Sequence, residues 1–114
     1  MIKTEFGIIE DINETQSYSY DPDKYHCVFI DDEIYIDEWW NKLLLLKTYF
    51  HSLNRPEFGL ARYGITLIPP ESLPAFQEIV LSDKRLKQDE NLVKLAETIQ
   101  DAIQRNKYMI HYGI

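Results

Sequence analysis

The apolar residues between Trp39 and Leu53 recur at the spacing of an α-helix, and this pattern restricts the fold of the chain strongly. Five of them are three or four positions apart: Trp39, Leu43, Leu46, Phe50 and Leu53. Residues at this spacing share one side of a helix. Asp37 can cap the start of such a helix, and Pro56 limits its end, because proline disfavours a helical residue before it. We therefore expect a helix from about Asp37 to Leu53.

Two further helices are indicated later in the chain. Ser72 is a typical N-cap, and a short helix is expected from there to about Leu81. A longer helix is expected from about Asp89 to Arg105, where one apolar stripe faces a mostly polar side. Its stripe consists of Leu92, Leu95, Ala96, Ile99, Ala102 and Ile103. Asn106 is suited to end this helix in a left-handed conformation.

Short stretches rich in β-branched and aromatic residues predict strands. They are residues 2–12, 25–30, 33–36, 64–68 and 108–112, with a polar loop over 13–24 and a hairpin turn at Asp31-Asp32. The predicted order is β-β-β-α-β-α-α-β. This order is typical of an α+β fold, with a small mixed sheet of about four to five strands and three helices packed on it. We expect residues 1–114 to form one compact domain.

Composition indicates the cellular location expected for such a protein. The longest apolar run, Leu43 to Leu46, is far shorter than the roughly 20 residues of a membrane-spanning helix. The first residues contain acids where a secretory signal would be apolar. Cys27 is the single cysteine, so no internal disulfide can form. These features favour a cytoplasmic protein without a membrane span.

The net charge of −7 is distributed unevenly along the chain. Residues 1–40 carry eleven Asp and Glu against two Lys, whereas residues 41–114 carry eight Asp and Glu against ten Lys and Arg. Nucleic-acid binding depends on cationic side chains that neutralise phosphates, so this balance argues against it. It favours a basic protein partner, or a surface that serves solubility alone.

No nucleotide-binding, hydrolase-elbow, zincin or zinc-finger motif is present in the sequence. Thiol catalysis would need Cys27 beside His51 or His111, because a thiolate requires a nearby base. Arg55 and Arg62 could join such a pocket, or pair with the acidic first third of the chain. No metal or cofactor is expected, because the carboxylates lack calcium-loop spacing. An enzyme remains a second hypothesis, and a protein without catalysis is favoured.

The segment Phe29–Trp40, FIDDEIYIDEWW, holds five carboxylates in twelve residues. In a strand over 33–36, Glu33, Tyr35 and Asp37 would point outward together. This arrangement fits a solvated hairpin or a protein-binding face, since tyrosine suits interfaces that are partly wet. The candidate partner-binding residues are Asp31, Asp32, Glu33, Tyr35, Asp37 and Trp40.

The predicted first helix also carries apolar residues outside its main stripe, namely Trp40, Leu44 and Leu45. These three would be covered within the fold, or form a surface for a homo-oligomer. In size, charge and aromatic content the chain is similar to small acidic proteins that neutralise toxins or nucleases. We therefore expect a non-enzymatic inhibitor or immunity-type protein that masks a basic partner, with a small enzyme and a homo-oligomer as alternatives.

Overall fold

The computed structural model describes residues 2–13 and 16–113, which form an α+β fold. Its strands are β1 (Lys3–Ile9), β2 (Val28–Asp31), β3 (Lys47–Phe50), β4 (Pro56–Phe58), β5 (Ile65–Ile68) and β6 (Tyr108–Tyr112). Its α-helices are α1 (Asp37–Leu43), α2 (Leu73–Leu81) and α3 (Glu90–Arg105). Short helical turns cover Asp32–Ile36, Pro70–Ser72 and Leu86–Gln88.

All six strands of the described part belong to one open sheet with the order β2-β1-β6-β5-β3-β4. Every neighbouring pair is antiparallel, so the predicted mixed sheet is wrong, and the sheet has more strands than the expected four to five. The α+β class and the three helices are confirmed. The prediction assigned residues 33–36 to a strand and residues 37–53 to a helix, and it therefore missed β3. It placed no strand at residues 56–58, where β4 lies.

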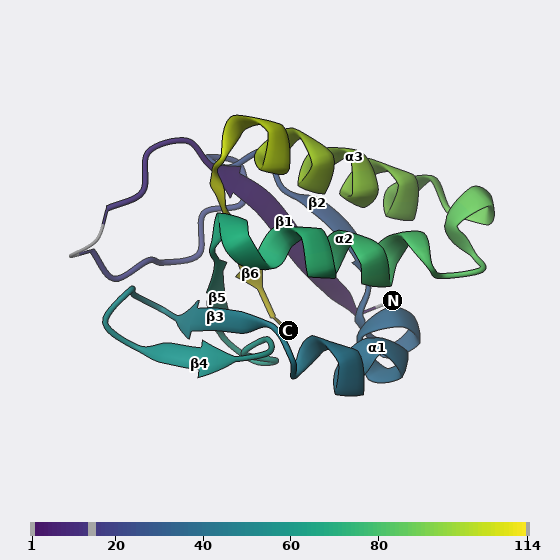
Figure 1. Ribbon diagram of the computed structural model, residues 1–114, viewed down its shortest axis with the longest axis horizontal. Coiled ribbons are helices and arrows are strands. Elements are labelled where there is room, and N and C mark those ends of the chain that lie inside the picture. Colours follow the sequence, from purple (N-terminus) through teal and green to yellow (C-terminus); the bar gives the residue numbers. More distant parts are fainter. Residues whose placement is uncertain (1, 14–15, 114) are drawn as a thin grey trace.

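The helices α2 and α3 lie side by side across one face of the sheet (Figure 1). Alternate residues of the strands point into this layer, because successive side chains of a strand face opposite sides. Phe6, Ile30, Ile68 and Met109 are all buried there against apolar residues of the helices. This side holds the larger hydrophobic core.

The opposite face of the sheet is covered by a loop segment rather than by helices. The segment between β1 and β2, described at residues 10–13 and 16–27 and called here the covering segment, packs Tyr18 and Tyr25 against Ile110 and Tyr112. It comes close at Gly7, where a Cβ atom would stand 2.6 Å from the carbonyl oxygen of Tyr25. The missing side chain of Gly7 therefore allows this contact.

The first predicted helix is shorter than expected. Helix α1 ends at Leu43, and Lys47–Phe50 forms β3, which pairs with β4 on one side and β5 on the other. Hydrogen bonding to two neighbouring strands outweighs the continued helical spacing of Phe50 and Leu53. Trp39, Leu43 and Leu46 are buried as the pattern predicts.

The predicted strand over residues 33–36 and its hairpin are also wrong. Residues Asp32–Ile36 form one turn of π-helix that continues into α1. Asp31, not Asp37, caps this helical segment, because its carboxylate accepts a hydrogen bond from the amide of Ile34 at 3.1 Å. Strand β2 pairs with β1 instead of with a hairpin partner.

The later elements agree closely with the prediction. Asp89 caps α3 through the amide of Asn91, and Asn106 ends it in the left-handed conformation with a φ of 55°. Strand β6 follows at Tyr108–Tyr112 and pairs with both β1 and β5. This strand is thus held inside the sheet, between β1 and β5.

Candidate functional site

The six predicted partner-binding residues lie at the end of β2 and along the helical segment that follows. Asp32 and Tyr35 are 1% and 3% exposed, so the expectation that Tyr35 points outward is wrong. The π-helical turn places Tyr35 on the core side and leaves Ile34 exposed. Glu33 and Asp37 are exposed, and their role in partner binding stays a prediction.

Arg62 connects several of these residues. Its guanidinium donates to the Oδ2 of Asp32 at 2.8 Å and also pairs with Asp37. The same group lies 5.5 Å from the ring centroid of Trp40. The predicted pairing of Arg62 with the acidic first third is thereby confirmed, and these acids have an internal function.

Arg85 forms a second cluster next to α1. Its guanidinium lies 4.6 Å from the centroid of the Tyr35 ring and pairs with Asp83 and Glu38. The hydrogen bonds from Arg85 hold the pKa of the Asp83 carboxyl well below its usual range. The hydroxyl of Tyr35 donates to Asp89 at 2.6 Å. Tyr35 therefore joins the π-helical turn before α1 to the start of α3.

The residues considered for thiol catalysis do not meet. Cys27 is the last residue of the covering segment and is half-buried against the sheet, and burial raises its pKa to about 12, which disfavours the reactive thiolate. His111 lies on the other face of the sheet, with its ring 4.9 Å from that of Phe6. His51 sits after β3, with its ring against Gly64, and Arg55 is exposed.

His111 has a defined hydrogen-bond arrangement within the sheet. Its Nε2 lies 2.7 Å from the hydroxyl of Thr4, which donates to the carbonyl of Tyr112. Its Nδ1 lies 3.1 Å from the hydroxyl of Thr66, which accepts from the amide of Ala61. A neutral ring protonated on Nε2 satisfies every one of these contacts. This geometry is structural rather than catalytic.

The candidate self-association residues lie in α1, which contains Trp40, and in the turn after it, which contains Leu44 and Leu45. Leu45 is 81% exposed and Leu44 43%, whereas Trp40 is half-buried. Phe58 on the edge strand β4 is also exposed, and Leu44 contacts the adjoining Gly59. Whether these residues bind a second copy remains a prediction.

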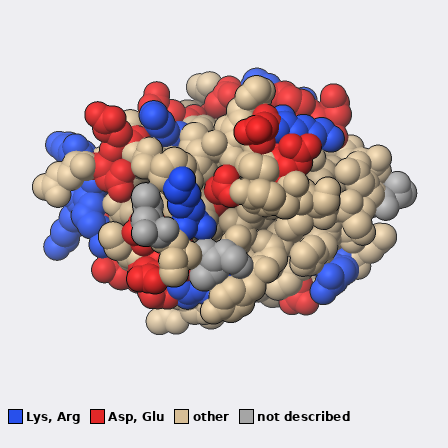
Figure 2. Space-filling model, turned by 180° about the vertical axis from the view of Figure 1, so that it is seen from behind, with Lys and Arg blue, Asp and Glu red and all other residues tan. Residues whose placement is uncertain are grey.

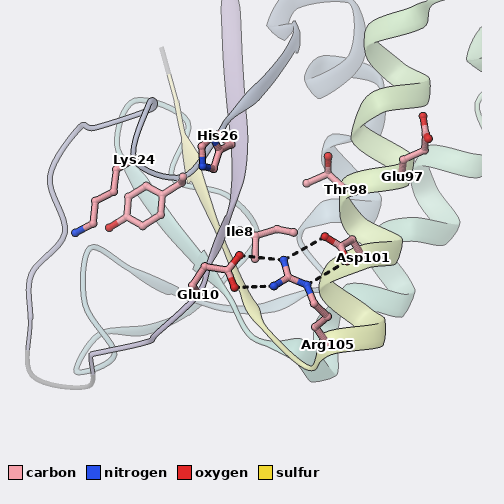
Figure 3. Close-up of a pocket in the computed structure, with 9 residues that line it drawn as sticks. Ile8, Glu10, Lys24, His26, Glu97, Thr98, Asp101 and Arg105 are labelled. Atoms are coloured by element: carbon pink, nitrogen blue, oxygen red, sulfur yellow. Dashed lines mark hydrogen bonds and ion pairs between the residues drawn. The ribbon is translucent and has the colours of Figure 1, made fainter.

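A groove between the covering segment and α3 brings polar side chains together (Figure 3). We call it the loop–helix groove, and its volume is about 380 Å³. Lys24 and His26 stand on the side of the covering segment, and Glu97 and Thr98 on the side of α3 (Figure 3). The remaining lining residues are Ile8, Glu10, Tyr25, Asp101 and Arg105.

An ion-pair network crosses one end of the loop–helix groove. Arg105 binds both carboxylate oxygens of Glu10, at 2.6 and 3.0 Å, and both of Asp101, at 3.1 Å each. The hydrogen bonds from Arg105 lower the pKa of Glu10. This network ties the end of β1 to α3. Glu97 is exposed and forms no ion pair with another described residue.

The covering segment presents acids beside tyrosine. Asp21 and Asp23 are exposed, and Tyr20 between Ser19 and Asp21 is 63% exposed. The hydroxyl of Tyr20 donates to Glu5, a hydrogen bond that raises the pKa of Tyr20 to about 12. On this side of the molecule, charged residues gather mainly along the margins of a broad uncharged area (Figure 2). The surface therefore combines carboxylates with wide uncharged regions.

The hydroxyl of Tyr112 fixes this surface to the sheet. It accepts from the amide of Asp21 at 3.1 Å and donates to the carbonyl of Ser19 at 2.9 Å. Sequence reasoning treated residues 13–24 as a polar loop and did not predict the groove beside it. The signal was the repeated tyrosine at positions 18, 20 and 25, which marks a loop that packs on a core.

Among the described residues, no group of three or more His, Cys, Asp or Glu is placed to hold a metal ion. None of their helices is long and apolar enough to span a membrane. Comparison with models of known protein families, with curated proteins and with solved structures finds no match to this chain.

Proposed function

We propose that this protein is a non-enzymatic binding protein, of the inhibitor or immunity type, that masks a basic protein partner. The contact surface consists of the covering segment and the adjoining loop–helix groove. Its central residues are Asp21, Asp23, Tyr20 and Glu97. The proposal places the partner surface at residues 20–23 and α3 rather than at residues 31–40, where Asp32 and Tyr35 are engaged internally.

The observation that carries this proposal is that the carboxylates outnumber the arginines that pair with them inside the fold. Six carboxylates share three arginines in ion pairs: Asp32, Asp37, Glu38, Asp83, Glu10 and Asp101. These three arginines are thus already paired within the fold, and the protein keeps its net charge of −7. Asp21 and Asp23 stay exposed next to an exposed tyrosine, where an external cation can reach them.

Such a surface suits recognition of a basic protein for two physical reasons. The carboxylates attract a cationic partner over a distance of about one Debye length, which speeds association. Tyr20 supplies contact area at a small cost in side-chain entropy, because its hydroxyl is already held by Glu5. Charge then governs the association rate, and the aromatic contact governs the lifetime of the complex.

The proposal is tested by neutralising two carboxylates of the covering segment. Immobilised protein is first used to capture a partner from a lysate of the source organism, and association with the purified partner is then measured at two salt concentrations. The variant Asp21→Asn/Asp23→Asn should associate about tenfold more slowly at low salt, with a smaller dependence on salt.

The matched control is Glu71→Gln/Glu78→Gln, which changes the charge equally at exposed positions in and before α2. Its association rate should stay near that of the unmodified protein. Equal rates for both variants, or a captured partner that is acidic, would contradict the proposal. A third variant, Glu33→Gln/Asp37→Asn, measures whether the exposed acids of the originally predicted segment contribute.

A further inference from the structure

A second groove lies between α2 and α3, on the outer side of the helical layer. We call it the interhelix groove, and its volume is about 300 Å³. Leu81 and Val93 line it and are 49% and 37% exposed, and Leu86 and Ala96 line it as well. The side chains of Gln77 and Gln100 bridge the two helices beside it with a hydrogen bond of 2.7 Å. The groove is therefore apolar, with a polar rim formed by this glutamine pair and by Glu97.

The internal packing of the fold does not explain this exposed apolar surface. Helix α3 buries Leu92, Leu95 and Ile99 on its core side, and Val93 points away from that stripe. The other exposed positions of α3 are polar or charged. Exposed apolar side chains that line a groove on neighbouring helices mark an interaction surface more strongly than scattered ones do.

The size of the interhelix groove restricts what it can hold. Pockets that enclose a small ligand have volumes of about 300 to 1,000 Å³ and several polar groups that orient the ligand. The interhelix groove is at the lower limit of this range and is lined mainly by aliphatic side chains. It suits one or two aliphatic side chains supplied by another protein. The neighbouring helices α2 and α3 form a surface on which a third helix can lie.

Charge indicates the nature of that helix. Glu97 lines the interhelix groove and also the loop–helix groove on the other side of α3. A residue bound in the interhelix groove therefore lies close to a carboxylate that forms no ion pair with the described residues. A second copy of the chain would bring a further net charge of −7 to this surface, whereas a basic helix would be attracted to it.

We propose that the interhelix groove binds an amphipathic helix of the basic partner. An aliphatic side chain of that helix fills the space between Leu81 and Val93, and a Lys or Arg about one turn away pairs with Glu97. This inference rests on the proposed function and extends it, because it adds an aliphatic anchor on the helical layer to the aromatic contact of Tyr20.

The probe is a synthetic amphipathic helical peptide of Leu and Lys with a fluorescent label, and binding is followed by fluorescence anisotropy. Two peptides serve as comparisons. One has Glu in place of Lys, and the other has Ser in place of Leu. The Leu/Lys peptide should bind at least about tenfold more tightly than either, because binding needs both an apolar anchor and a positive charge.

Variants of the protein locate the binding. Leu81→Ser/Val93→Ser should weaken binding of the Leu/Lys peptide about tenfold, and Glu97→Gln about threefold. Leu45→Ser is the matched control, because Leu45 is exposed but lies outside the groove. Its affinity should not change. Since all four positions are exposed, thermal melting should confirm that each variant folds.

With the purified protein, three results would overturn the inference. They are unchanged affinity in Leu81→Ser/Val93→Ser, equal binding of the Leu/Glu peptide, and a dimer of the unmodified protein in light scattering that Leu81→Ser disrupts. The last result would assign the groove to a second copy. If Asp21→Asn/Asp23→Asn slows association of the captured basic partner but Leu81→Ser/Val93→Ser leaves the lifetime of the complex unchanged, the groove inference fails while the proposed function stands. If no basic partner is captured, the proposed function fails.

Discussion

At the scale of single residues, His111 shows how a group suited to catalysis can serve structure instead. Its ring is buried in the middle of the sheet, and both nitrogens are used by threonine hydroxyls. Burial lowers the pKa of His111 to about 3, so the ring stays neutral in the folded protein. The sequence shows a histidine in a strand, but not the hydroxyls that approach it from two neighbouring strands.

This histidine predicts a specific dependence of stability on pH. Below its ordinary pKa of 6.5 the unfolded chain binds a proton at His111, whereas the folded protein does not. Its contribution is therefore fully present above pH 6.5 and is lost as the pH falls toward 3, by about 1.4 kcal/mol per pH unit. The unmodified protein should therefore lose free energy of unfolding when the pH falls from 7 to 5. In His111→Gln this loss should be smaller by about 2 kcal/mol. Urea titrations at both pH values measure it, and an unchanged difference would contradict the assignment.

Arg62 is the residue on which the helical segment after β2 depends. Asp32 is nearly inaccessible to water and receives its hydrogen bond from this guanidinium. A buried carboxylate without its cation is strongly unfavourable. The acidity of FIDDEIYIDEWW is thus partly a requirement of folding, which a count of charges along the chain does not reveal.

Removing the cation should therefore be costly. Arg62→Met is expected to reduce the free energy of unfolding by about 3 kcal/mol, because Asp32 stays buried without a partner. The double variant Arg62→Met/Asp32→Asn should recover part of that loss. Arg55→Met, a change at an exposed arginine, should stay within about 0.5 kcal/mol of the unmodified protein. Chemical unfolding monitored by tryptophan fluorescence compares all three. A loss in Arg55→Met equal to that in Arg62→Met would contradict the role of the pair.

At the scale of elements, the covering segment behaves as a part of the fold although its described residues form neither helix nor strand. Tyr18 and Tyr25 are buried on the sheet, and Tyr112 holds the backbone at Ser19 and Asp21. Its approach to β1 depends on the absence of a side chain at Gly7, where a Cβ atom would stand 2.8 Å from the sulfur of Cys27.

Gly7→Ala should displace this segment. The added methyl group is expected to cost about 2 kcal/mol of stability, because the close contact is with backbone as well as side chain. Cys27 should then react faster with a thiol reagent, since the segment that contains it is loosened from the sheet. Ser17→Ala changes an exposed residue of the same segment and serves as the control. Equal labelling rates in Gly7→Ala and the unmodified protein would show that the segment is held in another way.

The elements that the sequence predicts well are those determined by local signals. Helix α3 combines a regular apolar stripe, a capping aspartate and a left-handed asparagine, and its bounds were predicted closely. The error at residues 37–53 has a different origin. Phe50 and Leu53 continue the helical spacing by coincidence, while Lys47–Phe50 is held as a strand by partners at residues 56–58 and 65–68. Such distant pairing leaves no periodic trace in the strand itself.

The candidate site was less predictable than the fold for the same reason. The loop–helix groove joins residues 24–26 to residues 97–105, and the interhelix groove depends on how α2 lies against α3. The sequence does show the ingredients, namely the tyrosines of the covering segment, the i,i+4 pair of Asp101 and Arg105, and the apolar Val93 on a polar side of a helix. It does not show which of them meet.

At the scale of the whole molecule, the uneven charge of the chain is partly resolved by folding. Arg62, Arg85 and Arg105 come from the later part of the chain, and each binds at least one carboxylate from the first forty residues. The acids left over are distributed over the surface, with Asp21 and Asp23 on the covering segment. The asymmetry is thus both a means of holding distant segments together and the source of a residual negative surface.

The position of β6 in the sheet order has a consequence for how the protein is made. This strand lies between β1-β2 on one side and β5-β3-β4 on the other, and it contains His111, whose partner Thr4 is 107 positions earlier. During synthesis the two half-sheets therefore leave the ribosome before the strand that joins them, with β1 and β5 each presenting an unpaired edge. Contacts of such long sequence separation slow folding, and open strand edges favour aggregation. Until β6 pairs with both β1 and β5, these two edges stay open to pairing with another chain.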